Sequence, residues 1–250
     1  MILVLGGTSE ARELATLLDA AGARFMSSLA GRVAQPRLPV GAVHVGGFGG
    51  VPGLRSFLLE YRVTAVVDAT HPFAQGMTAN AVAACSADAV PLLRLERPGW
   101  SDAPGADSWH WVDDHDAAAA AAARLGEHPF LTVGRQSLDH FVGPLADHRT
   151  LVRAVDEPDR PLPASWTLLL SRGPYLLDEE RALFEDHEVD VIVTKDSGGS
   201  YTWPKMQVAA ERGAAVVIVR RGPGPQGIAV VSDPQAAAAW VVAVSDGGRR

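Results

Sequence analysis

The chain has 250 residues, of which 47% are hydrophobic and 20% are charged, and its formal net charge is −7. These fractions exclude wholesale disorder, and at roughly 150 residues per domain the length predicts one large domain or two smaller ones. The single cysteine, Cys85, excludes an intramolecular disulfide framework, and the negative net charge argues against a general nucleic-acid binder. Because the sequence shows no signal-peptide pattern and no apolar run of roughly 18 residues, we expect a soluble, cytoplasmic protein with no membrane contact and no bound metal.

Short apolar runs rich in β-branched residues alternate with longer segments rich in alanine and leucine. The runs predict strands at Ile2–Leu5, Arg24–Ser28, Ala42–Val45, Thr64–Asp68, Leu92–Leu95, Trp109–Val112, Phe130–Val133, Thr150–Ala154, Trp166–Leu170, Val189–Val193, Ala215–Val219 and Ile228–Val231. The longer segments predict helices at Ser9–Ala21, Val51–Tyr61, Ala74–Ala87, Asp116–Leu125, Asp178–Asp186, Tyr201–Arg212 and Asp233–Val244. The alternation predicts an α/β fold with mostly parallel sheets covered by helices.

A division into two halves is expected after residue 125. The alanine run at positions 117–123 is bounded by Asp116 and by Gly126, which indicates a helix with an acidic start and a glycine stop. A new strand follows, and the number of expected strands exceeds what one compact sheet holds. We therefore expect two Rossmann-like domains, residues 1–125 and 126–250, with a cleft between them.

The first strand is followed by Gly6, Gly7, Thr8 and Ser9, and then by a helix. Two glycines let the backbone approach a ligand closely, and the helix start offers N–H groups that, with the two hydroxyls, can bind a pyrophosphate. The spacing differs from the G-x-G-x-x-G pattern of dinucleotide-binding folds. A plain glycine turn with a serine helix cap therefore stays open as the alternative interpretation.

A dinucleotide-binding site also requires a residue at the end of the second strand that binds the adenosine ribose. NAD-binding folds carry an acidic residue there for the ribose hydroxyls. This chain instead has Ser28, Gly31 and Arg32, and a guanidinium can bind a 2′-phosphate through charge-assisted hydrogen bonds. The pattern favours NADPH over NADH, with a solvated loop charge as the alternative interpretation of Arg32.

Further motifs occur in a fixed order along the chain. After the Gly-Gly-Thr-x-Glu-Ala-Arg start come Asp-Ala-Thr-His-Pro-Phe-Ala at 68–74, Asn80, Arg-Leu-Glu-Arg-Pro-Gly-Trp at 94–100, Val-Thr-Lys-Asp-Ser-Gly-Gly at 193–199, Lys205 and Arg220-Arg221. Together these motifs resemble the precorrin-6A reductases of cobalamin biosynthesis over almost the whole chain. Pro204 departs from the family pattern; because proline is tolerated in a first helical turn, it is expected to delay the helix start, and it leaves the direction of Lys205 open.

The resemblance implies an NADPH-dependent oxidoreductase with a two-domain Rossmann-like fold. It implies hydride transfer to the C18=C19 double bond of precorrin-6A, which gives precorrin-6B, while relatives of the anaerobic pathway use a cobalt-loaded substrate. Residues 1–125 would bind NADPH and residues 126–250 the tetrapyrrole. Other enzymes of the corrin pathway are further partners to test.

Thr70, His71 and Pro72 follow the fourth strand, at the carboxyl edge where α/β folds bind ligands. We expect this loop to lie along the nicotinamide ribose. Reduction of the double bond also needs a proton, and the imidazole of His71 titrates near neutral pH. Two interpretations stay open: His71 donates the proton, or it holds the loop or cofactor while water supplies the proton.

The second half carries a candidate site for anionic groups. Lys195, Asp196, Ser197 and Gly198 follow a strand, and their lysine, hydroxyl and glycine suit the acetate and propionate carboxylates of a precorrin. Arg97, Lys205 and Arg220 are further candidates for carboxylate pairing, with ordinary surface cations as the alternative interpretation.

Two rival functions remain. A non-catalytic NADP-binding sensor needs the first loop and Arg32 but has no use for the second loop at 195–199. Methyl transfer to the same macrocycle leaves Arg32 without a purpose. Both features therefore favour the reductase.

Overall fold

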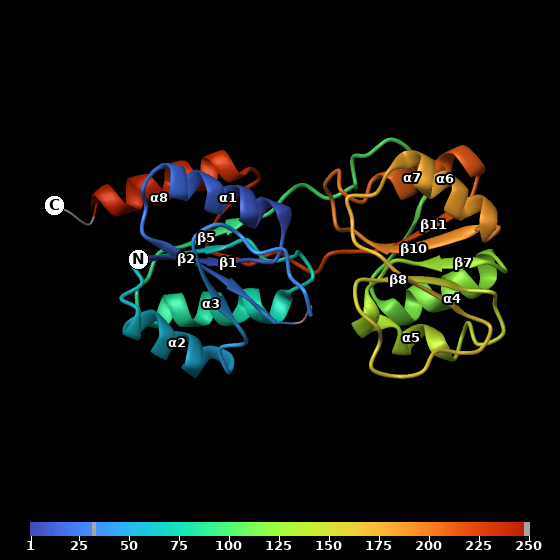
Figure 1. Ribbon diagram of the computed structural model, residues 1–250, viewed down its shortest axis with the longest axis horizontal. Coiled ribbons are helices and arrows are strands. Elements are labelled where there is room, and N and C mark those ends of the chain that lie inside the picture. Colours follow the sequence, from blue (N-terminus) through green and yellow to red (C-terminus); the bar gives the residue numbers. More distant parts are fainter. Residues whose placement is uncertain (32–33, 248–250) are drawn as a thin grey trace. The chain divides into compact units, whose positions relative to one another are not determined.

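The structure, a computed structural model, describes residues 1–31 and 34–247. The chain forms two compact units (Figure 1). Unit 1 consists of Met1–Pro98 together with Pro223–Arg250, and unit 2 consists of Gly99–Gly222. Among the described residues, no helix is long and apolar enough to cross a membrane.

Unit 1 is a parallel sheet with two helices on each face. Its elements are β1 (Ile2–Leu5), α1 (Ser9–Ala20), β2 (Phe25–Leu29), β3 (Ala42–Val45), α2 (Gly50–Glu60), β4 (Ala65–Asp68), α3 (Gln75–Ala87), β5 (Leu92–Leu95), β12 (Ala229–Val231) and α8 (Pro234–Gly247). The sheet has six strands in the order β12-β5-β4-β1-β2-β3, and every pair is parallel. Helices α1 and α8 pack together on one face, and α2 and α3 pack together on the other (Figure 1).

Unit 2 repeats this plan. Its elements are η1 (Ala106–Ser108), β6 (His110–Val112), α4 (His115–Leu125), β7 (Pro129–Leu131), η2 (Arg135–Ser137), α5 (Asp139–Val142), β8 (Leu151–Ala154), β9 (Thr167–Leu170), α6 (Leu177–Asp186), β10 (Val191–Lys195), α7 (Pro204–Arg212) and β11 (Ala215–Val219). Its six strands follow the order β6-β11-β10-β7-β8-β9, again all parallel. The predicted α/β class with two parallel sheets is confirmed.

The two units exchange their outermost strands. Each sheet has the doubly wound order 3-2-1-4-5-6 of dinucleotide-binding folds. In unit 1 the sixth place is taken by β12, near the end of the chain, and in unit 2 it is taken by β6, which follows unit 1 in sequence. The division at residue 125 expected from the sequence therefore differs from the structure: β6 and α4 belong to unit 2, and β12 and α8 return to unit 1. A three-residue strand carries no local signal of which sheet it joins.

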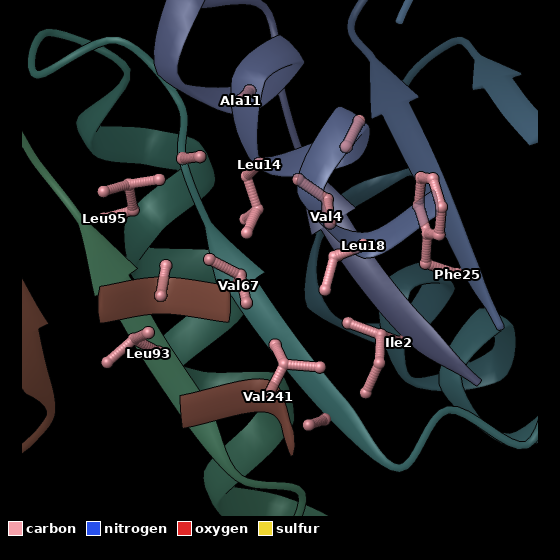
Figure 2. Close-up of a cluster of buried hydrophobic side chains, with 14 residues drawn as sticks. Ile2, Val4, Ala11, Leu14, Leu18, Phe25, Val67, Leu93, Leu95 and Val241 are labelled. Carbon is pink, nitrogen blue, oxygen red and sulfur yellow. The ribbon is translucent and has the colours of Figure 1, made fainter. Parts of the chain in front are cut away.

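The core of unit 1 explains why β1 is apolar at every position. Ile2 and Val4 pack under α1 and α8, where Leu14, Leu18 and Val241 meet them (Figure 2). Leu3 and Leu5 point to the opposite face, toward α2 and α3. A strand covered by helices on both faces buries all of its side chains, whereas a helix buries one stripe.

The core of unit 1 also explains Cys85. This residue lies buried on α3, and burial raises the pKa of its thiol to about 11. Cys85 is therefore an inert packing residue.

All of the predicted strands and helices are present, and their ends differ from the predicted ones by at most three residues. Helix α7 begins at Pro204 instead of Tyr201, because proline fits the first helical position but removes a backbone donor from a later turn. Strand β10 continues to Lys195, so this lysine ends the strand and does not follow it. The short helices η1, η2 and α5 carried no sequence signal.

Candidate functional site

The loop between β1 and α1 is compact and held by backbone contacts. The Gly6 N–H donates to the Ser28 carbonyl at 2.8 Å, and a Cβ on Gly6 would lie 3.4 Å from that oxygen. Gly7 has a φ of 111°, which side chains other than glycine's rarely allow. The glycines therefore bring the backbone of β1 close to β2 and leave the loop surface without side chains.

Thr8 is the N-cap of α1, a place the sequence interpretation gave to serine. Its Oγ1 accepts from the Ala11 N–H at 3.1 Å and donates to the Ala69 carbonyl at 2.8 Å. Ser9 is the first helical residue, and its hydroxyl donates to Glu10 Oε2 at 3.1 Å. Both hydroxyls that were predicted to bind the cofactor therefore make hydrogen bonds within unit 1. The N–H groups in the first turn of a helix have no partner within the helix and can bind an anion, and here Thr8 Oγ1 already occupies that of Ala11.

A small pocket lies beside the glycine loop. It is lined by Gly6, Gly7, Ala11, Arg12, Ser27, Leu29, Arg37 and Pro39. Two arginines, Arg12 and Arg37, therefore line a pocket at the amino end of α1, where the helix dipole is positive. The Ser27 side chain is 2% exposed, and its hydroxyl has no hydrogen-bond partner among the described residues. Cations, a helix start and an unpaired hydroxyl together favour a phosphate-bearing ligand.

The sequence interpretation missed Arg12, Arg37 and Ser27. Arg12 could have been found, because a side chain one turn into a helix points back toward its N-terminus. Arg37 follows no pattern, since it lies in a loop without periodicity. Of the predicted residues, Gly31 lies exposed after β2 with a φ of 70°, and Arg32 lies outside the described residues, so its contact stays a prediction.

A buried charge network underlies the loop after β4. Asp68 is 0% exposed and Arg94 is 1% exposed, and Arg94 Nη1 lies 2.9 Å from Asp68 Oδ1. Glu96 Oε2 accepts from Arg94 Nε at 2.8 Å. The other oxygen of Asp68 accepts from the Thr78 hydroxyl on α3 at 2.6 Å. The network joins β4, β5 and α3, and both oxygens of the buried Asp68 carboxylate accept hydrogen bonds, as a buried charge requires.

The same network fixes the predicted ribose loop. The Thr70 N–H and hydroxyl both donate to Asp68 Oδ1, at 3.1 and 2.7 Å. His71 Nδ1 accepts from the Phe73 N–H at 3.2 Å, so in the neutral ring the proton is on Nε2. Pro72 lies in the turn before α3. The loop thus holds His71 with Nδ1 occupied and an Nε2–H that can donate.

Unit 2 buries an excess of positive charge at the end of β10 and the start of α7. The sequence contains two lysines, Lys195 and Lys205, and both lie here. Lys205 is 3% exposed, and its Nζ lies 5.2 Å from the centre of the Trp100 ring. Burial lowers the pKa of Lys205 to about 7, helped by Arg153, and burial lowers the pKa of Lys195 to about 8.

Arg153, on β8, adds a third cation to this cluster. Its Nη2 donates to Glu180 Oε1 at 2.6 Å, and its guanidinium lies 4.7 Å from the Phe130 ring centre and 4.0 Å from that of Tyr175. Glu180 partly offsets the charge of these cations, and its carboxylate acts to raise the pKa of Lys205, against the larger effect of burial. The surplus of positive charge makes the cluster suited to an anionic ligand.

The residues that follow Lys195 make hydrogen bonds and an ion pair inside unit 2. Asp196 Oδ1 accepts from the Trp100 N–H at 2.8 Å, and its Oδ2 lies 3.3 Å from Arg221 Nε. The Ser197 N–H donates to the Lys195 carbonyl, and Gly198 has a φ of 66°, so the chain turns sharply away from the sheet.

The predicted carboxylate-binding arginines lie in different units. Arg97 belongs to unit 1, where its Nη1 donates to Glu10 Oε2 at 2.7 Å. Arg220 belongs to unit 2, is half-exposed, and stacks 5.2 Å from the Trp111 ring with its Nε 3.6 Å from Asp113. The structure therefore brings Lys195 and Lys205 into one cluster of unit 2, whereas Arg97 belongs to unit 1. Among the described residues no group of three His, Cys, Asp or Glu side chains could hold a metal ion.

Known proteins resemble this chain over nearly its full length. Residues 1–242 match the sequence profile of the family described as precorrin-6x reductase CbiJ/CobK. Precorrin-6A reductase of Rhodococcus erythropolis is 48% identical over 96% of each chain, and that of Mycobacterium tuberculosis is 44% identical over the same shares. A solved structure described as CobK precorrin-6A reductase aligns with a TM-score of 0.90 at 36% identity, and covers 97% of this chain and 96% of its own.

Proposed function

The chain belongs to the precorrin-6x reductase family, and on this premise we propose that it is an oxidoreductase of cobalamin biosynthesis that reduces precorrin-6A with NADPH. When bound, NADPH supplies a hydride for the C18=C19 double bond, and one proton completes the reduction to precorrin-6B. The observation that carries the cofactor assignment is the pocket beside the glycine loop, with Arg12 and Arg37 on its lining.

Unit 1 is the proposed cofactor unit. The backbone at Gly6 and Gly7 and the first turn of α1 bind the pyrophosphate, because these N–H groups carry the positive end of the helix. Arg37 and Arg32 come from the segment after β2, where a dinucleotide places its adenosine ribose, and they bind the 2′-phosphate. Arg12, one turn into α1, neutralises the pyrophosphate.

His71 is proposed as a positioning group for the cofactor. Its Nε2–H donates toward the nicotinamide side, while Nδ1 stays engaged with the Phe73 N–H. Because Nδ1 is engaged in this contact, we assign His71 the positioning role and assign the proton to water. A His71→Ala enzyme with near-normal turnover at saturating NADPH eliminates His71 as the acid.

Unit 2 is the proposed substrate unit. Lys195 and Lys205 meet carboxylates of the macrocycle, with Arg220 at the exposed rim. An arriving carboxylate supplies the negative charge that the cluster lacks, so binding favours the protonated lysines. Neutralising Lys195 is expected to raise the KM for precorrin-6A while leaving NADPH affinity nearly unchanged. If NADPH affinity falls instead, this strand end serves the cofactor.

Nucleotide titration tests the cofactor assignment. We expect NADPH to bind more tightly than NADH, and Arg37→Ala or Arg32→Ala to remove that preference, at a cost of about tenfold in NADPH affinity, or ~1.4 kcal/mol. Arg12→Ala should weaken both nucleotides alike. Arg24→Ala, an exposed arginine just before the amino end of β2, is the matched control and should change neither affinity.

Two outcomes contradict the proposal. Failure of both nucleotides to bind at micromolar concentration makes the first loop a plain turn. Tight NADPH binding without turnover of precorrin-6A favours the non-catalytic sensor.

A further inference from the structure

The chain passes between the two units twice, and one carboxylate holds both passages at unit 2. The first passage lies between Pro98 and Gly99, and the second between Gly222 and Pro223. Asp196 Oδ1 accepts from the Trp100 N–H at 2.8 Å. Arg221 Nε donates to the Asp196 carbonyl at 2.8 Å and lies 3.3 Å from its Oδ2. Asp196 is 7% exposed, so these charge-assisted bonds are shielded from water.

Gly99 makes this arrangement possible. A Cβ at this position would lie 2.5 Å from Asp196 Oδ2 and 2.9 Å from Oδ1. No side chain fits there while the carboxylate stays in place, so the backbone of the first passage lies directly against Asp196.

The other end of the first passage is anchored in unit 1. Arg97 Nη1 donates to Glu10 Oε2 at 2.7 Å, and both side chains are mostly buried. Glu10 lies in the first turn of α1, directly beside the glycine loop. The segment 97–100 is therefore fixed at one end next to the proposed cofactor loop and at the other end to the residue that follows Lys195.

We propose that Asp196 is a positioning residue that fixes the two points, beside the Lys195 strand end, where the chain leaves unit 2. The inference rests on the proposed function, in which one ligand binds to each unit. Hydride transfer needs both reacting atoms in a narrow geometry, and misplacement by about 1 Å costs as much as a hundredfold in rate. Loss of the Asp196 contacts should therefore reduce turnover more than the binding of either ligand.

Asp190 provides a matched control at the opposite end of the same strand. Its carboxylate accepts from the backbone N–H groups of Glu127 and His128 at 2.8 and 3.0 Å. Gly126 lies against it as Gly99 lies against Asp196, because a Cβ on Gly126 would also collide with the carboxylate. Both carboxylates accept from backbone N–H groups and lie against a glycine, but Asp190 holds no passage between the units.

The experiment compares Asp196→Asn with Asp190→Asn, and Gly99→Ala with Gly126→Ala. We expect Asp196→Asn and Gly99→Ala to lower kcat for precorrin-6A by at least about tenfold, with KM and the Kd of NADPH within about twofold. Amide hydrogen exchange should accelerate in both 97–101 and 220–223. The control variants should keep kcat within about twofold and leave exchange in those segments unchanged.

Three results overturn the proposal: equal loss of kcat in the two pairs, a raised KM with unchanged kcat in Asp196→Asn, or unchanged exchange at both passages. The second result would make Asp196 a substrate-binding residue. A wild-type protein without turnover contradicts the proposed function instead, and hydrogen exchange then still decides whether Asp196 holds the passages.

Discussion

At the carboxyl edge of the first sheet Arg94 is buried between two carboxylates. At the edge of the second sheet Glu180 pairs with Arg153 and attracts Lys205, and Lys195 lies in the same cluster. The first group is complete: its cation and carboxylates are paired, and nearby hydroxyls fill the remaining positions. The second group carries surplus positive charge, and burial lowers the pKa of both lysines. A network in which every charge is paired holds its loop rigidly, whereas a cluster with surplus positive charge has affinity for an anion.

The largest expected effect comes from breaking the complete network. Asp68→Asn removes one of the two carboxylates from the buried Arg94 guanidinium, and should lower the free energy of unfolding by about 3–5 kcal/mol. Urea unfolding measures the change. Thr78→Val removes one hydrogen bond from the same carboxylate and should cost about 1–3 kcal/mol. If Asp68→Asn and Thr78→Val lower the free energy of unfolding by equal small amounts, Asp68 and Arg94 do not act as a coupled ion pair.

The second effect concerns removal of charge from the incomplete cluster. Lys205 has a pKa of about 7 in the folded protein, well below that of a free lysine. Between these two values the unfolded chain binds the proton and the folded protein does not, so stability rises as the pH increases above 7.

Lys205→Met should remove the contribution of Lys205 to this rise and leave the smaller contribution of Lys195, and it should cost little stability at pH 7. Urea unfolding at several pH values between 7 and 10 checks both statements. Because the sequence has two lysines, a ¹³C-lysine NMR titration follows each side chain directly, and Lys205→Met assigns the signals. A titration midpoint near pH 10 for both lysines would contradict the lowered pKa values of this cluster.

The third effect is kinetic. Lys195 is charged below a pKa of about 8 and loses its proton above it. The KM for an anionic macrocycle should therefore rise as the pH increases through 8, by about tenfold if one charge-assisted hydrogen bond is lost. Lys195→Met should show the high KM at every pH. The Kd of NADPH, measured over the same range, is the control and should lack this transition.

The smallest expected effect tests the cap of α1. Thr8→Ala removes the N-cap acceptor and the bond to Ala69, and should lower the free energy of unfolding by about 1 kcal/mol or slightly more. Ser9→Ala should change stability by less than about 0.5 kcal/mol, since its hydroxyl contacts only the neighbouring Glu10 side chain. Thermal unfolding of both variants measures the difference. If Ser9→Ala costs as much, Ser9 is the cap.

Local patterns were sufficient to predict the fold class, because β-branched runs and amphipathic helices are properties of short segments. The membership of β6 and β12 could not be predicted, since parallel pairing with β11 and β5 is decided far away in sequence. The same limit applies to Arg94, which reaches Asp68 because the two are register partners on adjacent strands. It applies to Asp196, whose carboxylate contacts Trp100 almost a hundred residues earlier in the chain. By contrast, the glycine loop and the lysine strand end were predictable, because the residues that form each of them are consecutive in the sequence.

The exchange of outermost strands also sets an order of completion during synthesis. Unit 2 is one continuous stretch, so all six of its strands exist once residue 219 has left the ribosome. Unit 1 starts earlier but lacks β12 and α8 until residues 229–247 emerge. In that interval the edge of β5 is unpaired and the apolar stripe of α1 is uncovered, so the growing chain exposes a template for wrong pairing. The unit begun first on the ribosome is the one completed last.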